Sequence, residues 1–211
     1  MLTAYPPELP SRIPPATRSA DWRFLLPLPD KGNVVLVGDN LGDAAYHFKQ
    51  FNISLTLLDS TYGLADLAEA VSSPTDVFAV PYGIPLNSPM SDLGGLDYNA
   101  LRQLIRPGGV LLVGFSNVYY KQRTGILSAR PRYIQTLLRQ ARYSAIDLYG
   151  AYPDLITPEY IFPLKTSILS YVLHFHWQNK LPEMFLRILS APLIVAGMAN
   201  IFRYYFLVAR V

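Results

Sequence analysis

The chain has 211 residues, which is enough for one well-buried domain and too few for two comfortable ones. It is 51% hydrophobic and 16% charged with a net charge of +3, and its lack of cysteine excludes disulfides, thiolate zinc sites and a cysteine nucleophile. No apolar run reaches the length of about eighteen residues that suggests a spanning helix, and the proline-rich start lacks the apolar core of a signal peptide. We therefore expect a cytoplasmic protein.

The chain opens with a segment that does not have the pattern of a helix or strand. Residues 1–20 are rich in proline, which predicts an irregular N-terminal arm. The short aromatic patch from Asp21 to Leu26 is expected to hold this arm against the domain.

The stretch from Gly32 to Asp59 predicts half of a nucleotide-type α/β unit. Its continuous apolar run Val34–Val37 is typical of a strand buried on both faces, and Leu55–Leu58 is predicted as a second apolar strand. Between them lie a glycine turn and a helical pattern from Asp43 to Gln50, and Asp59 ends the second strand. In such a unit glycines allow a ligand close to the backbone, the helix N-terminus favours a negative group, and the terminal acid can accept hydrogen bonds from ribose hydroxyls.

Alternating helical and strand patterns continue after Asp59. Ser60 or Thr61 is expected to cap the next helix, and the segment Pro158–Pro163 is expected to be irregular. The remaining elements are predicted, in chain order, as helix Tyr62–Val71, strand Val77–Val80, helix Asn99–Ile105, strand Val110–Phe115, helix Pro131–Arg142, strand Ser144–Tyr149 and strand Phe202–Val211.

An apolar insertion, residues 157–201, precedes the last strand. It carries two helical stretches, about Lys165 to Phe175 and Pro182 to Asn200. They present more apolar surface than one flank of a short sheet requires. This surface could form a substrate channel, a homodimer or hydrophobic protein interface, or a peripheral contact with a bilayer.

Positive charge is concentrated in the middle of the chain. Residues 98–146 contain no acid, whereas they contain the basic residues Arg102, Arg106, Lys121, Arg123, Arg130, Arg132, Arg139 and Arg142. This span is either an ordinary solvated surface or a face for an anionic partner. It contains no recognisable nucleic-acid-binding module, so specific nucleic-acid binding is not expected.

The order of elements resembles that of class I S-adenosylmethionine-dependent methyltransferases, from about Asp21 to Val211. The segments that carry the resemblance are VVLVGDNLG, LTLLD, TDVFAVP, LRQLIRPGGVLLVGFSN, LLRQARYSAIDLYG and YYFLVARV. It implies one Rossmann-like α/β domain over residues 1–211, with a mostly parallel sheet flanked by helices and an antiparallel last strand. The chain departs from the family in that only residues 60–75 separate Asp59 from Asp76. That gap fits one helix but not the usual additional strand, so the sheet is expected to be one strand short.

The resemblance also implies the positions of a cofactor site. In the family the first turn holds the methionine end of S-adenosylmethionine and the acid binds its ribose. The candidate cofactor-binding residues are therefore Gly38, Asp39, Asn40, Gly42, Asp59, Ser60 and Pro81. The candidate substrate-binding residues are Tyr82, Tyr119 and Tyr120.

Each candidate has a structural alternative. The glycines and Asn40 could simply form a strand-to-helix turn, Asp39 and Asp59 could cap helices, and Tyr82 could be a packed tyrosine. No residue is identified as catalytic, and no metal site is expected.

The resemblance favours methyl transfer from S-adenosylmethionine to a small-molecule acceptor, such as a sugar, a lipid or a biosynthetic intermediate of a natural product. Two alternatives remain. One is an inactive methyltransferase-like domain that serves as a binding or scaffold partner, and the other is a non-methylating reaction in the same pocket.

Overall fold

The computed structural model describes residues 21–27, 32–39, 41–42, 45, 48, 53–71, 73–83, 97–118, 128–165, 168, 182 and 202–211. The predicted arm 1–20, most of the predicted insertion, and the candidates Asn40, Tyr119 and Tyr120 lie outside these residues.

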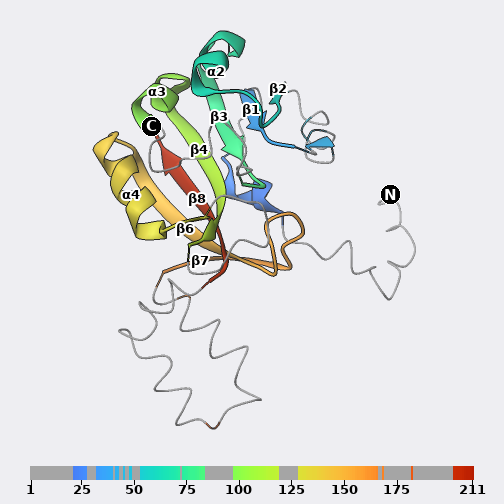
Figure 1. The fold of residues 1–211 in the computed structure, drawn as a ribbon, viewed down its shortest axis with the longest axis vertical. Coiled ribbons are helices and arrows are strands. Elements are labelled where there is room, and N and C mark those ends of the chain that lie inside the picture. Colours follow the sequence, from blue (N-terminus) through green and yellow to red (C-terminus); the bar gives the residue numbers. More distant parts are fainter. Residues whose placement is uncertain are drawn as a thin grey trace, which may run out of the picture.

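Short helices alternate with the strands of one sheet (Figure 1). The helical elements are η2 (Trp22–Leu25), α2 (Leu64–Ala70), α3 (Tyr98–Gln103) and α4 (Pro131–Gln140). Gly42, Ala45 and Phe48 are also helical. The strands are β1 (Asn33–Val37), β2 (Ser54–Leu58), β3 (Thr75–Val80), β4 (Ile105–Asn117), β5 (Ser128–Ala129), β6 (Ser144–Tyr152), β7 (Tyr160–Pro163) and β8 (Tyr204–Arg210).

The strands are ordered β2-β1-β3-β4-β8-β6-β7, and β5 pairs with the end of β4. The pairings from β2 to β4 are parallel, whereas β8 lies antiparallel between β4 and β6. All six residues of β3 are buried, as are the first six of β8, because both faces of the sheet centre are covered. This arrangement confirms the predicted fold class, including the antiparallel last strand.

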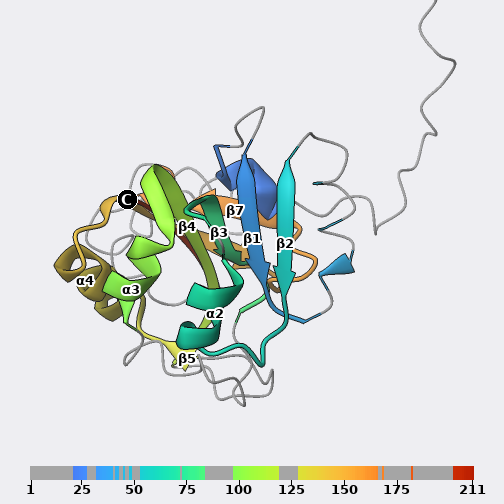
Figure 2. The ribbon, with the colours of Figure 1, turned by 90° about the horizontal axis from the view of Figure 1, so that it is seen from above.

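One face of the sheet is covered by α2, α3 and α4, which lie together in Figure 2. The apolar residues that pack there include Val35, Leu67, Leu101, Ile134 and Leu138. The opposite face packs against the N-terminal turn and the helical residues after β1. Its cluster contains Trp22, Val34, Leu36, Leu41, Phe48 and Phe206. The aromatic patch Asp21–Leu26 therefore anchors to the domain as expected.

The placement of α2 explains the short gap after Asp59. The crossover from β1 to β2 moves outward along the sheet, whereas the crossover through α2 returns from β2 past β1 to β3. Because parallel crossovers are right-handed, opposite directions of travel put the two connections on opposite faces. Phe48 accordingly packs in the cluster of Val34, while Leu67 of α2 packs in the cluster of Val35. The segment makes a single crossover, and β2 is the edge of the sheet that the structure describes, as the short gap predicted.

Three local predictions were wrong. The segment Pro158–Pro163 is not irregular, because β7 pairs antiparallel with β6 and its backbone groups are satisfied by that ladder. The N-cap of α2 is Gly63 rather than Ser60 or Thr61, and the Asp66 carboxylate accepts its N–H at 2.9 Å.

The third concerns β4, which begins at Ile105 instead of after the glycines. A register shift between Thr75 and Val77 of β3 accommodates the Pro107–Gly108 pair.

None of the helices in the described ranges is long and apolar enough to cross a membrane.

Candidate functional site

The carboxyl ends of β1, β2 and β3 meet at one edge of the sheet. In an open parallel sheet, ligands bind at this edge, next to the point where the strand order reverses. Here the reversal lies between β1, which leads outward to β2, and β3, which lies on its other side. The predicted residues Gly38, Asp39, Asp59, Ser60 and Pro81 directly follow these three strands. The topology therefore brings all five to one edge.

Gly38 makes the turn after β1 possible. Its φ of +144° is a conformation that residues with a side chain rarely adopt, although a Cβ there would have room, 3.7 Å from Leu41 Cδ2. Its N–H donates to the Leu58 carbonyl at 2.9 Å, so the turn is fixed to the end of β2. The Ala45 N–H donates to the Leu41 carbonyl at 2.8 Å, a bond of the helical i to i−4 type. Gly42 is helical, and a Cβ added there would meet nothing within 4 Å.

Asp39 has a structural role that the sequence did not predict. Its Oδ1 accepts hydrogen bonds from the Ser60 hydroxyl at 2.8 Å and from the Ser60 N–H at 3.4 Å. Ser60 is 9% exposed, while Asp39 is exposed. The Asp39 carboxylate thus connects the turns after β1 and β2. It still lies at the edge of the sheet formed by the carboxyl ends of β1, β2 and β3.

Asp59 is exposed and partly engaged. Its Oδ1 accepts the Thr61 N–H at 2.8 Å and also the Thr61 hydroxyl. These two bonds, the hydroxyl foremost, hold the pKa of the carboxyl below its usual value. Asp59 therefore does not cap α2, and its Oδ2 has no hydrogen-bond partner among the residues described. An ionised oxygen with this freedom can accept hydrogen bonds from a ligand's hydroxyl groups.

The loop after β3 is held close to the sheet. A Cβ at Gly114 of β4 would lie 2.3 Å from the Pro81 carbonyl oxygen, so the loop crosses β4 where only glycine fits. Tyr82 is partly buried and contacts Trp22 edge to face, with ring centroids 6.3 Å apart. Of the two roles expected for Tyr82, packing is therefore the one that the structure documents.

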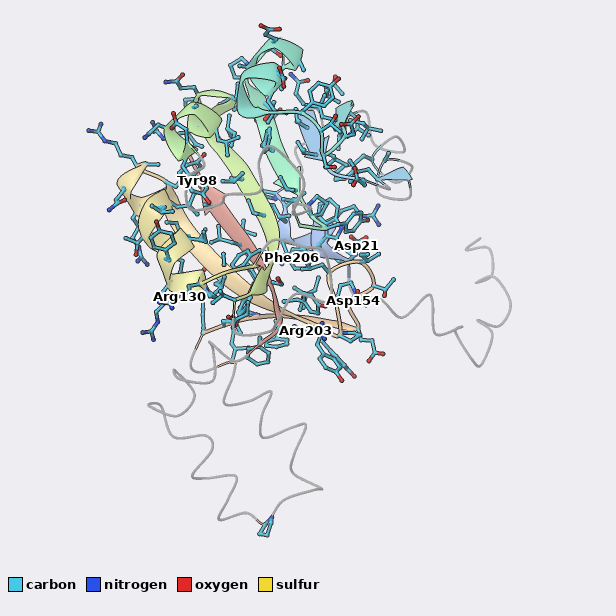
Figure 3. The ribbon with its side chains drawn as sticks, viewed as in Figure 1. Asp21, Tyr98, Arg130, Asp154, Arg203 and Phe206 are labelled. Atoms are coloured by element: carbon cyan, nitrogen blue, oxygen red, sulfur yellow. The ribbon has the colours of Figure 1, made fainter. Side chains whose placement is uncertain are left out.

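The end of β4 contains buried polar residues that sequence reasoning missed. Asn117 is fully buried, and its Nδ2 donates to the Phe202 carbonyl at 3.1 Å and to the Tyr205 hydroxyl at 3.0 Å. These bonds fasten the end of β4 to the start of β8, the strand that carries Phe206, which is labelled in Figure 3. The signal was the polar pair Ser116-Asn117 at the end of an otherwise apolar strand.

An open groove begins at Asp59 and follows α2. It is lined by Asp59, Thr61, Tyr62, Asp66, Glu69 and Ala70. Tyr62 was not predicted as a site residue, and it supplies the aromatic surface of this groove. Three carboxylates line the groove, so it favours neutral or positively charged groups over phosphates. In the described ranges no three histidine or acidic side chains gather as a metal site would require.

Comparison with known proteins supports the fold assignment. No protein-family model matches the chain, and no curated protein matches it by sequence. Among solved structures, it is similar to a SAM-dependent methyltransferase from Archaeoglobus fulgidus, with a TM-score of 0.52, 10% identity, and coverage of 85% of this chain and 86% of that one.

Two further structures are more distant. A Haemonchus contortus phosphoethanolamine N-methyltransferase 2 (TM-score 0.48, 14% identity) aligns over 89% of this chain and 50% of its own. A putative sarcosine dimethylglycine methyltransferase from Galdieria sulphuraria (TM-score 0.47, 8% identity) aligns over 85% of this chain and 78% of its own. The chain has the class I S-adenosylmethionine-dependent methyltransferase-like fold.

Proposed function

We propose that this chain uses its methyltransferase-like fold to bind S-adenosylmethionine across the ends of β1 and β2. We further propose that it transfers the methyl group to a small-molecule acceptor, such as a sugar, a lipid or a natural-product intermediate. The observation that carries the proposal is the pairing of the Gly38 turn with the unengaged Asp59 Oδ2 at neighbouring strand ends.

The residues at this edge fit the chemistry of the cofactor. S-adenosylmethionine carries a sulfonium and an ammonium, and the edge presents the exposed carboxylates of Asp39 and Asp59. Neither carboxylate has an ion-pair partner within the described part of the chain. Asp59 would accept the ribose hydroxyls, and Asp39, with the turn at Gly38, would border the methionine end. A phosphate-bearing nucleotide would be repelled by the same charges.

The adenine end of the cofactor would lie where this chain departs from the family. No described strand lies beyond β2, so the acid or amide that normally follows such a strand is not supplied there. The groove along α2 begins at Asp59, and Tyr62 provides an aromatic surface within it. We infer that the Tyr62 ring stacks on the adenine in place of the acid or amide that would otherwise bind it. Such stacking does not depend on hydrogen bonds to the base.

Methyl transfer requires little of the protein beyond orientation. When bound, S-adenosylmethionine supplies a methyl group that is already a strong electrophile. The task of the chain is to hold an acceptor oxygen or nitrogen in line with that methyl group, which can account for much of the rate. The loop Pro81–Gly83, fixed over Gly114, is the rigid element next to the proposed site.

A binding or scaffold role is the second candidate, and two observations favour it. The Gly38 N–H is used by the sheet, and one oxygen of each acid is already engaged, by Ser60 and by Thr61. A domain with these contacts could persist without a cofactor.

Isothermal titration calorimetry with S-adenosylmethionine and with its demethylated product tests the cofactor step. We expect binding, and we expect Asp59→Asn to weaken it by about 1.5–3 kcal/mol, the range for hydrogen bonds to a charged group. Glu159→Gln is the matched control, because Glu159 is an exposed acid at the start of the β7 hairpin. Absence of heat and of any thermal shift with both compounds would favour the scaffold role.

The transfer step needs a separate measurement. Incubation of the protein with methyl-labelled cofactor and a small-molecule extract should produce labelled product. Binding without any labelled product would favour a non-methylating reaction in the same pocket.

A further inference from the structure

The outer surface of α4 is strongly basic. Ile134 and Leu138 face the core, with exposed fractions of 1% and 0%. Arg132 and Arg139 are exposed, and their spacing of seven residues places them on one stripe of the helix, opposite the buried side. Figure 3 shows Arg130 at the start of this helix, on the outside of the molecule.

Among the residues that the structure describes, no acidic side chain forms an ion pair with this stripe. Residues 98–146 contain no acid. The next acid, Asp147, alternates along β6 with Ile146 and Leu148, which pack on the α4 side, so it points to the opposite face. There it forms an ion pair with Lys165 at 3.3 Å. On the neighbouring α3, the Asp97 carboxylate accepts the N–H groups of its own helix.

Two other arginines of the acid-free span have structural roles, which distinguishes them from the stripe. Arg106 forms an ion pair with the buried Asp76. Arg102 is partly buried beside Tyr143, and its charge acts on the Tyr143 hydroxyl. By contrast, no ion pair involves Arg132, Arg139 or Arg142 in the ranges that the structure describes.

The residue just after α4, Arg142, is positively charged and has a backbone conformation that is unfavourable for a residue with a side chain. Arg142 has a φ of +62°, and its N–H donates to the Arg139 carbonyl at 3.0 Å while the Tyr143 N–H donates to the Leu138 carbonyl at 3.0 Å. This is a Schellman-type helix end, where glycine is the usual residue. Tyr133, which follows Arg132 on α4, is 51% exposed. Arginines flanked by an exposed tyrosine suit the headgroup region of a membrane.

We propose that the outer surface of α4, carried by Arg132, Arg139, Arg142 and Tyr133, docks the protein onto an anionic lipid bilayer. The attachment is electrostatic and peripheral, because the apolar side of α4 is part of the core and cannot insert. It does not depend on methyl transfer. The Val118 N–H at the end of β4 bonds to the Ala129 carbonyl just before α4, so the start of α4 lies beside the carboxyl end of β4.

Co-sedimentation with vesicles tests this inference with the full chain. The vesicles are phosphatidylcholine alone or phosphatidylcholine mixed with phosphatidylserine, at about 0.05 M and about 0.5 M salt. We expect binding only to the anionic vesicles and a loss at high salt. Since each arginine near an anionic surface contributes about fivefold, Arg132→Gln/Arg139→Gln should weaken binding about 25-fold. The matched control, Arg132→Lys/Arg139→Lys, keeps the charge and should retain it.

Three results would overturn the inference. They are equal binding to neutral vesicles, unchanged binding by the double glutamine variant, or preference for a single-stranded oligonucleotide over anionic vesicles at the same salt. Thermal unfolding of both double variants establishes that they are folded, which is expected because the two side chains are exposed.

Discussion

The Ser60 hydroxyl donates a hydrogen bond to the Asp39 carboxylate at 2.8 Å, and this contact joins the turn after β1 to the turn after β2. The Gly38 N–H, bonded to the Leu58 carbonyl, joins the same two turns through the backbone. The carboxylates of Asp39 and Asp59 are therefore held on two turns that cannot move independently.

The Asp39–Ser60 contact should be measurable as a coupling energy. Ser60→Ala removes the hydroxyl from a nearly buried site, so we expect a loss of about 1 kcal/mol in the free energy of unfolding. In a background of Asp39→Ala the same substitution should cost much less. Urea denaturation of the four proteins measures this, and equal costs in both backgrounds would show that the bond contributes nothing.

Two glycines at the edge should respond in opposite ways to alanine. Gly114→Ala places a Cβ against the Pro81 backbone, so the loop or β4 must shift, and we expect a loss of about 3 kcal/mol. Gly42→Ala meets open space within a helix and should be neutral or stabilising by up to about 1 kcal/mol. Chemical denaturation compares them.

Gly42→Ala also separates stability from ligand binding. If Gly42 contacts the cofactor as predicted, this variant should bind S-adenosylmethionine more weakly while remaining at least as stable as the wild type. Unchanged affinity would remove Gly42 from the site.

Tyr143 should make stability sensitive to alkaline pH. Burial raises the pKa of its hydroxyl, while the nearby Arg102 lowers it by less. In the unfolded chain the Tyr143 hydroxyl ionises with a pKa of about 10, and in the folded protein it ionises at higher pH. Its contribution to the free energy of unfolding is therefore fully present below about pH 10 and declines as the pH rises above that value. Above pH 10 the wild type should lose about 1.4 kcal/mol per pH unit relative to Tyr143→Phe.

The same variant gives an internal check at neutral pH. There it lacks the hydrogen bond from the Tyr143 hydroxyl to the Tyr98 carbonyl, 3.3 Å long, and should be less stable by about 0.5–1 kcal/mol. The two stability curves, measured by denaturation between pH 7 and about pH 11, should cross. Parallel curves would contradict the assignment.

Arg142→Gly should stabilise the fold while it weakens membrane docking. Glycine adopts the positive φ at the end of α4 without the cost of a side chain, so we expect a gain of about 1 kcal/mol in the free energy of unfolding. Thermal unfolding and vesicle binding of one preparation measure both effects. A destabilised variant would mean that interactions of the arginine side chain outweigh the backbone strain.

The sequence predicted the central strands well because their signal is local. The runs Val34–Val37 and Val77–Val80 are apolar on both faces, which is typical of strands covered on two sides. It also predicted a helix from Pro131 to about Arg142, which the structure has as α4. The missing strand followed from a count of residues after Asp59, since a chain segment of that length holds only one helix.

Other features depend on partners far away in the sequence. The local pattern of Pro158–Pro163 does not indicate a strand, because β6 supplies the ladder of β7. The pattern around Pro107 and Gly108 predicts a later start for β4, because the register shift that accommodates them depends on β3. The roles of Asp39, Asn117 and Tyr82 depend on Ser60, Tyr205 and Trp22, respectively.

What the sequence determined by itself is the order of elements, the five candidate residues that follow β1, β2 and β3, and the acid-free basic span. These follow from local periodicity, turn chemistry and charge, which each residue carries wherever it is placed. Only the tertiary structure decided that α2 lies on the face opposite the helical residues after β1. It also decided that one oxygen of Asp59 has no partner among the described residues. The same holds for the arginines, since Arg132 and Arg139 face outward while Arg106 pairs with Asp76. Those facts depend on the handedness of crossovers and on which side chains meet across the sheet, and no local pattern contains that information.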